Sequence, residues 1–308
     1  DDAPRLVYAD FLMERGDPRG EYIQLACAGR GKEAYDRQHA LLAKHQKAWI
    51  APIRPFIRSW DWSRGFVRRV EAIGAKFVEG AEAIFSTTPL LDAKLTGLAP
   101  PTLEKLAETP LGTLRSLSIS QQRITPKTAR VLQSPSLAGL VTLDVAANPL
   151  GDAGVATLAG SRHLGALRAL DLAHCRTGID GLEALSNAEF FPRLTKLVLN
   201  ASNYGPDAIP LGPRAGALLS RGEALAFLSL DGCRLGDDGI EAIATSPAMQ
   251  NLEHLSLYGN DITARGALAL ARSPHLTKLR NVLGLDDREK TFGTEAAKAL
   301  DDRFGPAR

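Results

Sequence analysis

The chain has 308 residues, of which 23% are charged and 44% are hydrophobic, and its formal net charge is +2. A charge this close to zero gives no global electrostatic reason to expect nucleic acid or a membrane surface as a partner. No run of 18 or more apolar residues occurs, so the sequence predicts no membrane-spanning helix. The three cysteines, Cys27, Cys175 and Cys233, are too few and odd in number for a secreted disulfide framework, and none has zinc-ligand spacing. We therefore expect a cytoplasmic protein, with no metal site and no cofactor.

Aromatic residues are concentrated near the N-terminus, where residues 1–85 hold eleven of the 18. This shift in composition indicates a boundary between a head and the rest of the chain. We expect four parts in chain order: a helical domain (1–52), an N-terminal cap with degenerate repeats (53–110), a repeat array (111–285) and a C-terminal cap helix (286–308).

Three helices are predicted in the head, from near Pro4, over about 21–28 and over about 32–49. Asp1 and Asp2 precede the first helix and could cap it. Helical spacing predicts an apolar stripe on the first helix and a buried side on the third. The stripe is formed by Leu6, Val7, Phe11 and Met13, and the expected buried residues of the third helix are Tyr35, Leu41, Leu42 and Trp49. Asp10 and Glu14 lie one turn apart, as paired carboxylates might, but a solvated or arginine-paired helix face explains them as well.

The head also carries the segments RLVYADFL, ERGD and PRGEYI between Arg5 and Ile23. In these segments it resembles a small bacterial domain that accompanies repeat arrays, the repeat-companion domain. The resemblance covers about 30 residues. It implies a bacterial repeat protein, and it implies no catalytic activity.

The cap is predicted to hold strands at about 65–73 and 91–95 and helices at about 76–85 and 102–108. Residues 44–76 mix eight Lys or Arg with all three tryptophans. Such a mixture can bind single-stranded nucleic acid through phosphate pairing and base stacking, which is one alternative function. The simpler interpretation is that the rings form the core of the cap and the charges face water.

A pattern of L-x-x-L-x-L-x-x-N-x-L recurs along the array. In one unit the fixed positions are Leu140, Leu143, Val145, Asn148 and Leu150. Successive units begin 26, 27, 27, 31, 27 and 24 residues apart, and the last begins at Leu276 and Leu279. Each unit predicts a short strand whose alternate side chains point inward, a turn at the Asn position and a returning helix that starts at a capping Asp or Thr.

This pattern is that of a leucine-rich repeat, and its period with a full helix resembles the ribonuclease-inhibitor-like class. The resemblance implies an α/β solenoid: a horseshoe with parallel strands on the concave face and helices on the convex face. It also implies protein binding more often than catalysis. Cys175 and Cys233 both stand at the Asn position, two strands apart, so we expect both to be reduced residues that fill this turn.

The same register predicts which side chains point outward on the concave face. The outward positions are small and acidic in the first units and gain aromatic and cationic residues later, and these suit a protein interface. The candidate binding residues are Asp144, Asp171, Lys196, Asn200, Phe227, Asp231, His254, Tyr258 and Arg280. Among them Phe227, Asp231, His254 and Tyr258 are the expected centre of the site.

Two further features allow other interpretations. Residues 204–222 add about four residues and three prolines to one unit, so we expect a loop there that could be neutral or could bind. Asp171, His174 and Cys175 invite a catalytic reading, but Cys175 is predicted to point inward and His174 outward. We therefore expect a monomeric, non-enzymatic scaffold for a protein partner; the alternatives are nucleic-acid binding through residues 44–76 and a regulatory subunit or sensor of an enzyme.

Overall fold

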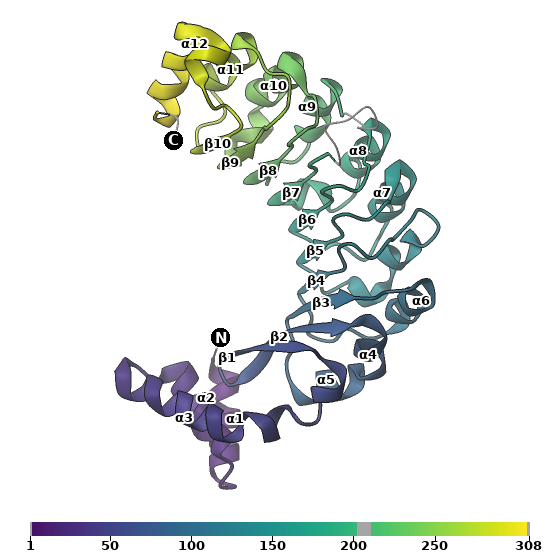
Figure 1. Ribbon diagram of the computed structural model, residues 1–308, viewed down its shortest axis with the longest axis vertical. Coiled ribbons are helices and arrows are strands. Elements are labelled where there is room, and N and C mark those ends of the chain that lie inside the picture. Colours follow the sequence, from purple (N-terminus) through teal and green to yellow (C-terminus); the bar gives the residue numbers. More distant parts are fainter. Residues whose placement is uncertain (1, 202–210, 307–308) are drawn as a thin grey trace. The chain divides into compact units, whose positions relative to one another are not determined.

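The computed structural model describes residues 2–201 and 211–306 (Figure 1). The chain divides into two compact units, residues 1–117 and 118–308. None of the helices in the described ranges is long and apolar enough to cross a membrane.

Three helices open the first unit, close to the predicted bounds: α1 (Ala3–Met13), α2 (Pro18–Ala28) and α3 (Gly31–Ile50). The carboxylate of Asp2, which stands before α1, makes no capping hydrogen bond. It instead accepts hydrogen bonds from Arg64 at 2.7 Å and Arg5 at 3.4 Å. The predicted capping role of Asp2 is therefore wrong, because two guanidinium groups compete for its oxygens.

The predicted apolar stripe of α1 does not face the core. Ala9 and Leu12 are buried, whereas Val7 is 70% exposed and Phe11 and Met13 are exposed as well. The reason is the close approach of α2 at Gly20, where an added Cβ would lie 2.5 Å from the carbonyl oxygen of Ala9. Because the two helices approach so closely, the small residue Ala9 faces the core. Of the residues expected to be buried on α3, Leu41 is buried but Tyr35 is 60% exposed.

A hairpin follows in the first unit, made of β1 (Ser59–Ser63) and β2 (Phe66–Ile73). The sequence indicated β2 but not β1. Arg64 and Gly65 both have positive φ, 50° and 86°, as a two-residue hairpin turn requires. The other elements of the unit lie close to the predicted strand and helices. They are η1 (Arg54–Phe56), α4 (Gly74–Glu79), α5 (Ala81–Thr87), β3 (Asp92–Thr96) and α6 (Pro100–Glu108). Strand β3 runs parallel to β2. Strand β4 (Ser116–Ser118) spans the division between the units.

Aromatic rings join the helical head to the hairpin. Tyr22 packs 5.3 Å from Trp49, and each of these rings lies 6.0 Å from Trp62. Ile23 and Phe66 share a small core with α1 residues. The head helices and the β1–β2 hairpin are thus stabilised by a common core.

The second unit repeats a strand followed by a helix. The strands are β5 (Thr142–Asp144), β6 (Ala169–Asp171), β7 (Lys196–Val198), β8 (Phe227–Ser229), β9 (His254–Ser256) and β10 (Asn281–Leu283). The helices are α7 (Gly151–Ala159), α8 (Ile179–Ser186), α9 (Arg214–Leu219), α10 (Gly236–Thr245), α11 (Ala264–Arg272) and α12 (Arg288–Phe304). Short 3-10 helices lie at η2 (Ala129–Gln133), η3 (Pro135–Leu137), η4 (Phe191–Arg193) and η5 (Pro247–Asn251).

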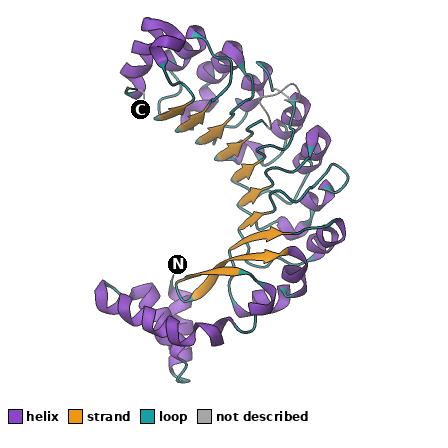
Figure 2. Ribbon diagram, viewed as in Figure 1, coloured by secondary structure: helices purple, strands orange, loops and turns teal. Residues whose placement is uncertain are grey.

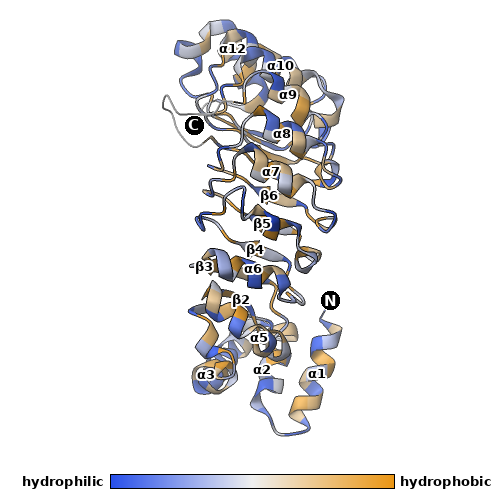
Figure 3. Cartoon of the chain, turned by 90° about the vertical axis from the view of Figure 1, so that its right-hand side faces the viewer, coloured by the Kyte–Doolittle hydropathy of each residue, from blue (hydrophilic) through white to orange (hydrophobic). Residues whose placement is uncertain are grey.

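Within this unit the strands line the inner side of a curve and the helices cover the outer side (Figure 2). The strands pair in parallel and in sequence order, with Leu143, Leu170, Leu197, Leu228 and Leu255 directly opposite one another. All five are buried. The predicted repeat register and the solenoid fold are confirmed over these strands. Seen from the helix side, hydrophilic and hydrophobic residues alternate along the helices, as expected for helices with one buried face (Figure 3).

The Asn position ties each turn to the unit before it. The amide of Asn148 donates to the carbonyl oxygen of Ile119 at 2.9 Å, and the thiol of Cys175 donates to that of Val145 at 3.1 Å. Cys233 makes the equivalent contact with Leu199 at 3.5 Å. Both cysteines are free and buried, so the prediction that they fill the Asn position is confirmed.

The aspartates at the helix starts join neighbouring units instead of capping their own helices. The carboxylate of Asp152 accepts a hydrogen bond from the backbone N–H of Gly178 in the next unit, at 2.6 Å. Asp237 likewise accepts from the backbone N–H groups of Thr263 at 2.8 Å and Gly266 at 3.0 Å. The predicted capping role is therefore wrong for these aspartates, although the Thr263 side chain does cap α11.

The last unit departs from the predicted register. Asn281 pairs with His254 and Val282 with Leu255, so the unit begins at Leu279, 27 residues after Leu252, and not at Leu276. Leu276 fits the pattern by spacing only. The true unit was hidden because Gly284 occupies the position of a leucine: an added Cβ there would lie 2.3 Å from the backbone nitrogen of Tyr258.

The predicted loop over residues 204–222 is described only in part. Residues 202–210, which include Pro206 and Pro210, lie outside the described residues. Pro213 directly precedes α9. At the C-terminal end α12 begins earlier than predicted and is kinked at Gly293, and its buried residues Ala296, Ala297 and Leu300 lie on the helix that packs against α11.

Candidate functional site

Four side chains form a row across the strands of the concave face. Lys196, Phe227, His254 and Asn281 stand directly opposite one another on β7, β8, β9 and β10. The Lys196 ammonium lies 4.8 Å from the centre of the Phe227 ring, and that ring lies 5.8 Å from the His254 ring. The amide nitrogen of Asn281 lies 2.9 Å from Nδ1 of His254. We call these four residues the ring row.

A second row, of polar groups, runs beside the ring row. The carboxylate of Asp231 accepts hydrogen bonds from the Asn200 amide at 3.2 Å, the Ser256 hydroxyl at 2.6 Å and the backbone N–H of Tyr258 at 3.0 Å. The Ser229 hydroxyl donates to Oδ1 of Asn200 at 2.7 Å. Asp231 is thus committed to holding its neighbours in place and has less capacity to bind a partner directly.

The two rows differ in what they offer to a ligand. Tyr258 is 41% exposed, Lys196 is exposed, and Phe227 and His254 are half-buried. A rigid, part-apolar surface flanked by a cation is the kind of surface that anchors a protein partner, because little conformational entropy is lost when it is covered.

The acidic half of the face is arranged differently. Asp144 and Asp171 stand opposite each other on the paired strands β5 and β6. Burial raises the pKa of Asp171, and the nearby carboxylate of Asp144 raises it further, although the backbone N–H of Ala173 opposes this by donating to it. Asp144 accepts a hydrogen bond from the Ser118 hydroxyl at 2.7 Å. Two neighbouring carboxylates make this half unfavourable for anions.

Arg280 does not occupy the concave position that the sequence predicted for it. Because the last unit begins at Leu279, Arg280 precedes β10, and its backbone N–H donates to the carbonyl oxygen of Glu253. The outward residues of β10 are Asn281 and Leu283, and Leu283 is 52% exposed. Sequence analysis missed both residues, and the 27-residue period of the earlier units was the signal that could have found them.

Asp171, His174 and Cys175 do not form a catalytic group. The Cys175 thiol is buried against a backbone carbonyl, and burial raises its pKa to about 12. His174 is exposed on a left-handed backbone, and its Nδ1 lies 3.0 Å from the carbonyl oxygen of Ala201. Burial raises the pKa of Cys233 to about 12 as well. A thiol with this pKa is almost fully protonated near neutral pH and is a poor nucleophile.

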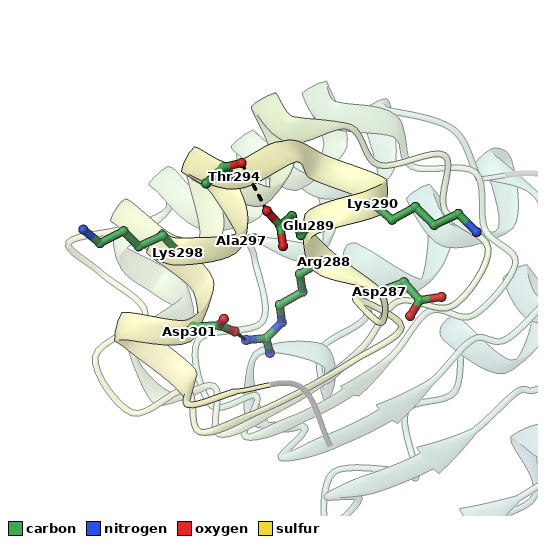
Figure 4. A pocket seen from close by; sticks show the side chains of 8 residues that line it. All are labelled: Asp287, Arg288, Glu289, Lys290, Thr294, Ala297, Lys298 and Asp301. Atoms are coloured by element: carbon green, nitrogen blue, oxygen red, sulfur yellow. Dashed lines mark hydrogen bonds and ion pairs between the residues drawn. The ribbon is translucent and has the colours of Figure 1, made fainter.

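Within residues 2–201 and 211–306 no three His, Cys, Asp or Glu residues are grouped to hold a metal. A hollow of about 710 Å³ lies beside α12 (Figure 4). Its buried Arg288 donates to the carboxylate of Asp301 and, at 2.7 Å, to the carbonyl oxygen of Gly305, while Lys290 and Lys298 point away from the hollow. The guanidinium is therefore used to hold the ends of α12 together.

The tryptophan rings of the basic segment 44–76 contact other side chains of the protein. Trp49 and Trp62 pack with Tyr22, and the Arg54 guanidinium lies 5.4 Å from the Trp60 ring. All three tryptophans are half-buried. A base would have to displace these contacts in order to stack on the rings.

Comparison with known proteins agrees with this geometry. The family model described as Leucine Rich repeat matches residues 140–159, 225–244 and 248–271. The chain contains leucine-rich repeats. No curated protein sequence matches it.

Two solved structures show a distant likeness to this chain. The crystal structure of the Rad7 and Elc1 complex in yeast is similar with a TM-score of 0.43 and 15% identity, over 98% of this chain and 89% of that chain. The crystal structure of a TLR13–ssRNA13 complex is similar with a TM-score of 0.41 and 18% identity, over 70% of this chain and 35% of that chain. Neither likeness is close enough to bear on what this chain binds.

Proposed function

We propose that the chain is a non-catalytic scaffold that binds a protein partner on the concave face of its leucine-rich repeats. The observation that carries the proposal is the ring row, Lys196, Phe227, His254 and Asn281, held in register by four paired strands. A partner that covers the Phe227 ring would remove apolar surface from water and keep the flanking cation in contact with it.

The polar row supports this function by making the surface rigid. Asp231 holds Asn200, Ser256 and the backbone of Tyr258, so the exposed Tyr258 ring projects from a fixed backbone. Buried thiols of high pKa and an arginine engaged with its own helix are features of a structural protein more than of an enzyme. We accordingly place partner binding at Lys196, Phe227, His254 and Tyr258, with Asp231 and Asn200 as supporting residues.

Affinity purification with mass spectrometry tests the proposal. The intact chain is compared with a Phe227→Ala/Tyr258→Ala variant and with a matched control, Thr142→Ala/Ser120→Ala, which changes the equivalent positions in two earlier units. We expect a protein that is recovered with the intact chain and the control and is lost with the first variant. Equal recovery with all three would contradict the placement of the site, and turnover of a substrate by the purified chain would contradict a non-catalytic role.

A further inference from the structure

A row of outward side chains crosses the concave face beside the ring row. Its members stand directly opposite one another on β5 to β9, and they are Asp144, Asp171, Val198, Ser229 and Ser256. The last three are short and buried, and the first two carry carboxylates. We call these five residues the middle row. Because the register is continuous over all five strands, a segment laid across them meets both the carboxylates and the Phe227 ring.

The carboxylates at the start of the middle row are open to a partner. Both aspartates are half-buried. The outward positions two residues before and after them carry only short side chains, which are Thr142 and Ala146 in one unit and Ala169 and Ala173 in the next. A long side chain of a partner therefore meets no large group on its way to Asp144 and Asp171.

The charges of this acidic pair are not neutralised within the protein. Asp144 accepts hydrogen bonds from the Ser118 hydroxyl at 2.7 Å and from the backbone N–H of Ala146 at 2.9 Å. Asp171 accepts one from the backbone N–H of Ala173, also at 2.9 Å. All three donors are neutral. Among the described residues, no Lys, Arg or His forms an ion pair with either carboxylate, so the pair keeps its negative charge.

Two cations at neighbouring positions leave the pair in this state. Arg168, which directly precedes β6, donates to backbone carbonyl oxygens of its own turn. The Lys196 ammonium lies against the Phe227 ring, 4.8 Å from its centre. Burial, and to a smaller extent the charge of Asp144, hold the pKa of Asp171 above its ordinary value despite Lys196. A further cation placed beside both carboxylates would relieve this unfavourable charge.

Resting on the function proposed above, we propose that the partner segment covering the Phe227 ring also carries a Lys or Arg side chain that binds between Asp144 and Asp171. The acidic pair and the ring lie two strands apart, on β6 and β8, which is about 10 Å across the sheet at a strand spacing of ~4.8 Å. An extended segment spans this distance in about three residues and a helix in about seven. The Lys196 ammonium repels a second cation at the ring, so the basic group belongs at the acidic pair.

The charge of the pair selects this occupant over others. Two carboxylates repel an acidic peptide and a run of phosphates alike, so both are unfavourable at this position. No third His, Cys, Asp or Glu among the described residues joins the pair to form a metal site. A protonated amine or guanidinium needs only the two carboxylates, because it has several N–H donors and can bond to both.

Selection from a displayed library of random peptides, each about sixteen residues long, tests the inference. Selections on the intact chain, on Asp144→Asn/Asp171→Asn and on Phe227→Ala/Tyr258→Ala are compared. On the intact chain we expect enrichment of peptides with a Lys or Arg about three or about seven positions from an aromatic or large aliphatic residue. The first variant should enrich the apolar residue without the basic one, and the second variant should enrich neither.

The outcomes separate the inference from the function on which it rests. Apolar enrichment without a basic preference on the intact chain, or an acidic preference at that spacing, would overturn the inference and leave the ring row as the binding site. No enrichment on the intact chain, or the same enrichment on Phe227→Ala/Tyr258→Ala, would overturn both.

Fluorescence anisotropy with a labelled synthetic copy of an enriched peptide then measures the contribution of the acidic pair. The charge-matched control is Asp180→Asn/Glu189→Gln, which removes two exposed carboxylates elsewhere in the second unit. We expect Asp144→Asn/Asp171→Asn to weaken binding by about tenfold or more, and the control by less than about twofold. Replacing the basic residue of the peptide by Gln should give the same loss on the intact chain and no further loss on the Asn variant. Equal losses for the variant and its control, or additive losses, would overturn the inference.

The melting temperature of the same variant separates binding from folding. Asparagine still accepts hydrogen bonds from the backbone N–H groups of Ala146 and Ala173, and the exchange removes two half-buried like charges. We therefore expect Asp144→Asn/Asp171→Asn to combine an unchanged or higher melting temperature with the loss of peptide binding. A lower melting temperature would show that the carboxylates serve the fold and would contradict the inference.

Discussion

Phe227 and His254 lie side by side on the paired strands β8 and β9, with ring centroids 5.8 Å apart and planes inclined by 33°. The two residues are 27 positions apart in sequence, one full repeat, so the contact exists only because the solenoid stacks its units in register. The pair forms the centre of the ring row and is the feature on which the proposed binding site depends.

Phe227 should contribute strongly to partner affinity and little to stability. We expect Phe227→Ala to weaken binding by roughly 30-fold or more, as for an aromatic hot spot, and to cost only about 1 kcal/mol in unfolding free energy because the ring is only half-buried. Phe227→Leu should lie between, since it keeps apolar area and loses the ring beneath Lys196. Calorimetric titration with the recovered partner measures the first effect and urea unfolding the second. An affinity loss that merely follows the loss of stability would argue against a direct contact.

Asn148 should be more important for stability than Cys175, although the two occupy the same position of the repeat. The Asn148 side chain donates to the carbonyl oxygens of Ile119 and Val145 and accepts from the backbone N–H of Ile124. Asn148→Ala leaves these buried groups unpaired, at a cost of about 3 kcal/mol or more, whereas Cys175→Ala loses a weak thiol bond and should cost about 1–2 kcal/mol. Urea denaturation midpoints decide between them, and a smaller loss for Asn148→Ala would contradict the roles assigned here.

Thiol reactivity should report the burial of the repeat cysteines. Burial raises the pKa of Cys175 and Cys233 to about 12, and it also raises the pKa of the half-buried Cys27. In the native protein near pH 8 we expect a thiol reagent to modify Cys27 slowly and to leave Cys175 and Cys233 unmodified on the same timescale. These two thiols are almost fully protonated, and the reagent cannot reach them. In denaturant all three should react. Fast native modification of Cys175, read by peptide mass spectrometry, would refute its inward placement.

Arg288 should hold the C-terminal helix in place. Its side chain is 8% exposed, and its guanidinium donates to the carbonyl oxygens of Leu285 and Gly305 and to the carboxylate of Asp301. Arg288→Ala leaves these groups without a partner and should cost about 3 kcal/mol, with faster hydrogen exchange confined at first to α12. Lys298→Ala on the same helix is the control and should change little. Uniform exchange throughout the second unit would mean that Arg288 does not act locally.

Asp237 should make the unfolding free energy of the protein depend on pH at values below the usual pKa of an aspartate. Although burial opposes it, hydrogen bonds from Thr263 and Gly266 lower the pKa of Asp237 below the usual 3.8. A carboxylate whose folded pKa lies below its unfolded pKa stabilises the fold above the unfolded value and loses that contribution as pH falls through the folded value. Asp237→Asn should therefore be less stable than the intact chain near pH 6, and the gap should narrow below about pH 4. A difference in stability that widens as the pH falls would contradict the lowered pKa of Asp237.

Much of the candidate site could be predicted from the chain because leucine spacing determines orientation. Once Leu228 and Leu255 are assigned to the inner side of their strands, the residues before them, Phe227 and His254, must point outward. The fourth member of the ring row, Asn281, could not be found in this way. Gly284 replaces the leucine that would have marked its unit, because the backbone of Tyr258 passes too close for a side chain.

The sequence by itself determined the repeat, its period and the inward or outward direction of most residues, because these follow from local spacing on a strand. Only the tertiary structure decided how neighbouring units share their polar groups: that Asp152 bonds to Gly178 and that Asp231 holds Ser256 and Tyr258. It also decided that Ala9, and not Phe11, faces the core of the head. Such outcomes depend on which groups compete for one hydrogen bond or one small space across distant parts of the chain, and local spacing carries no information about that competition.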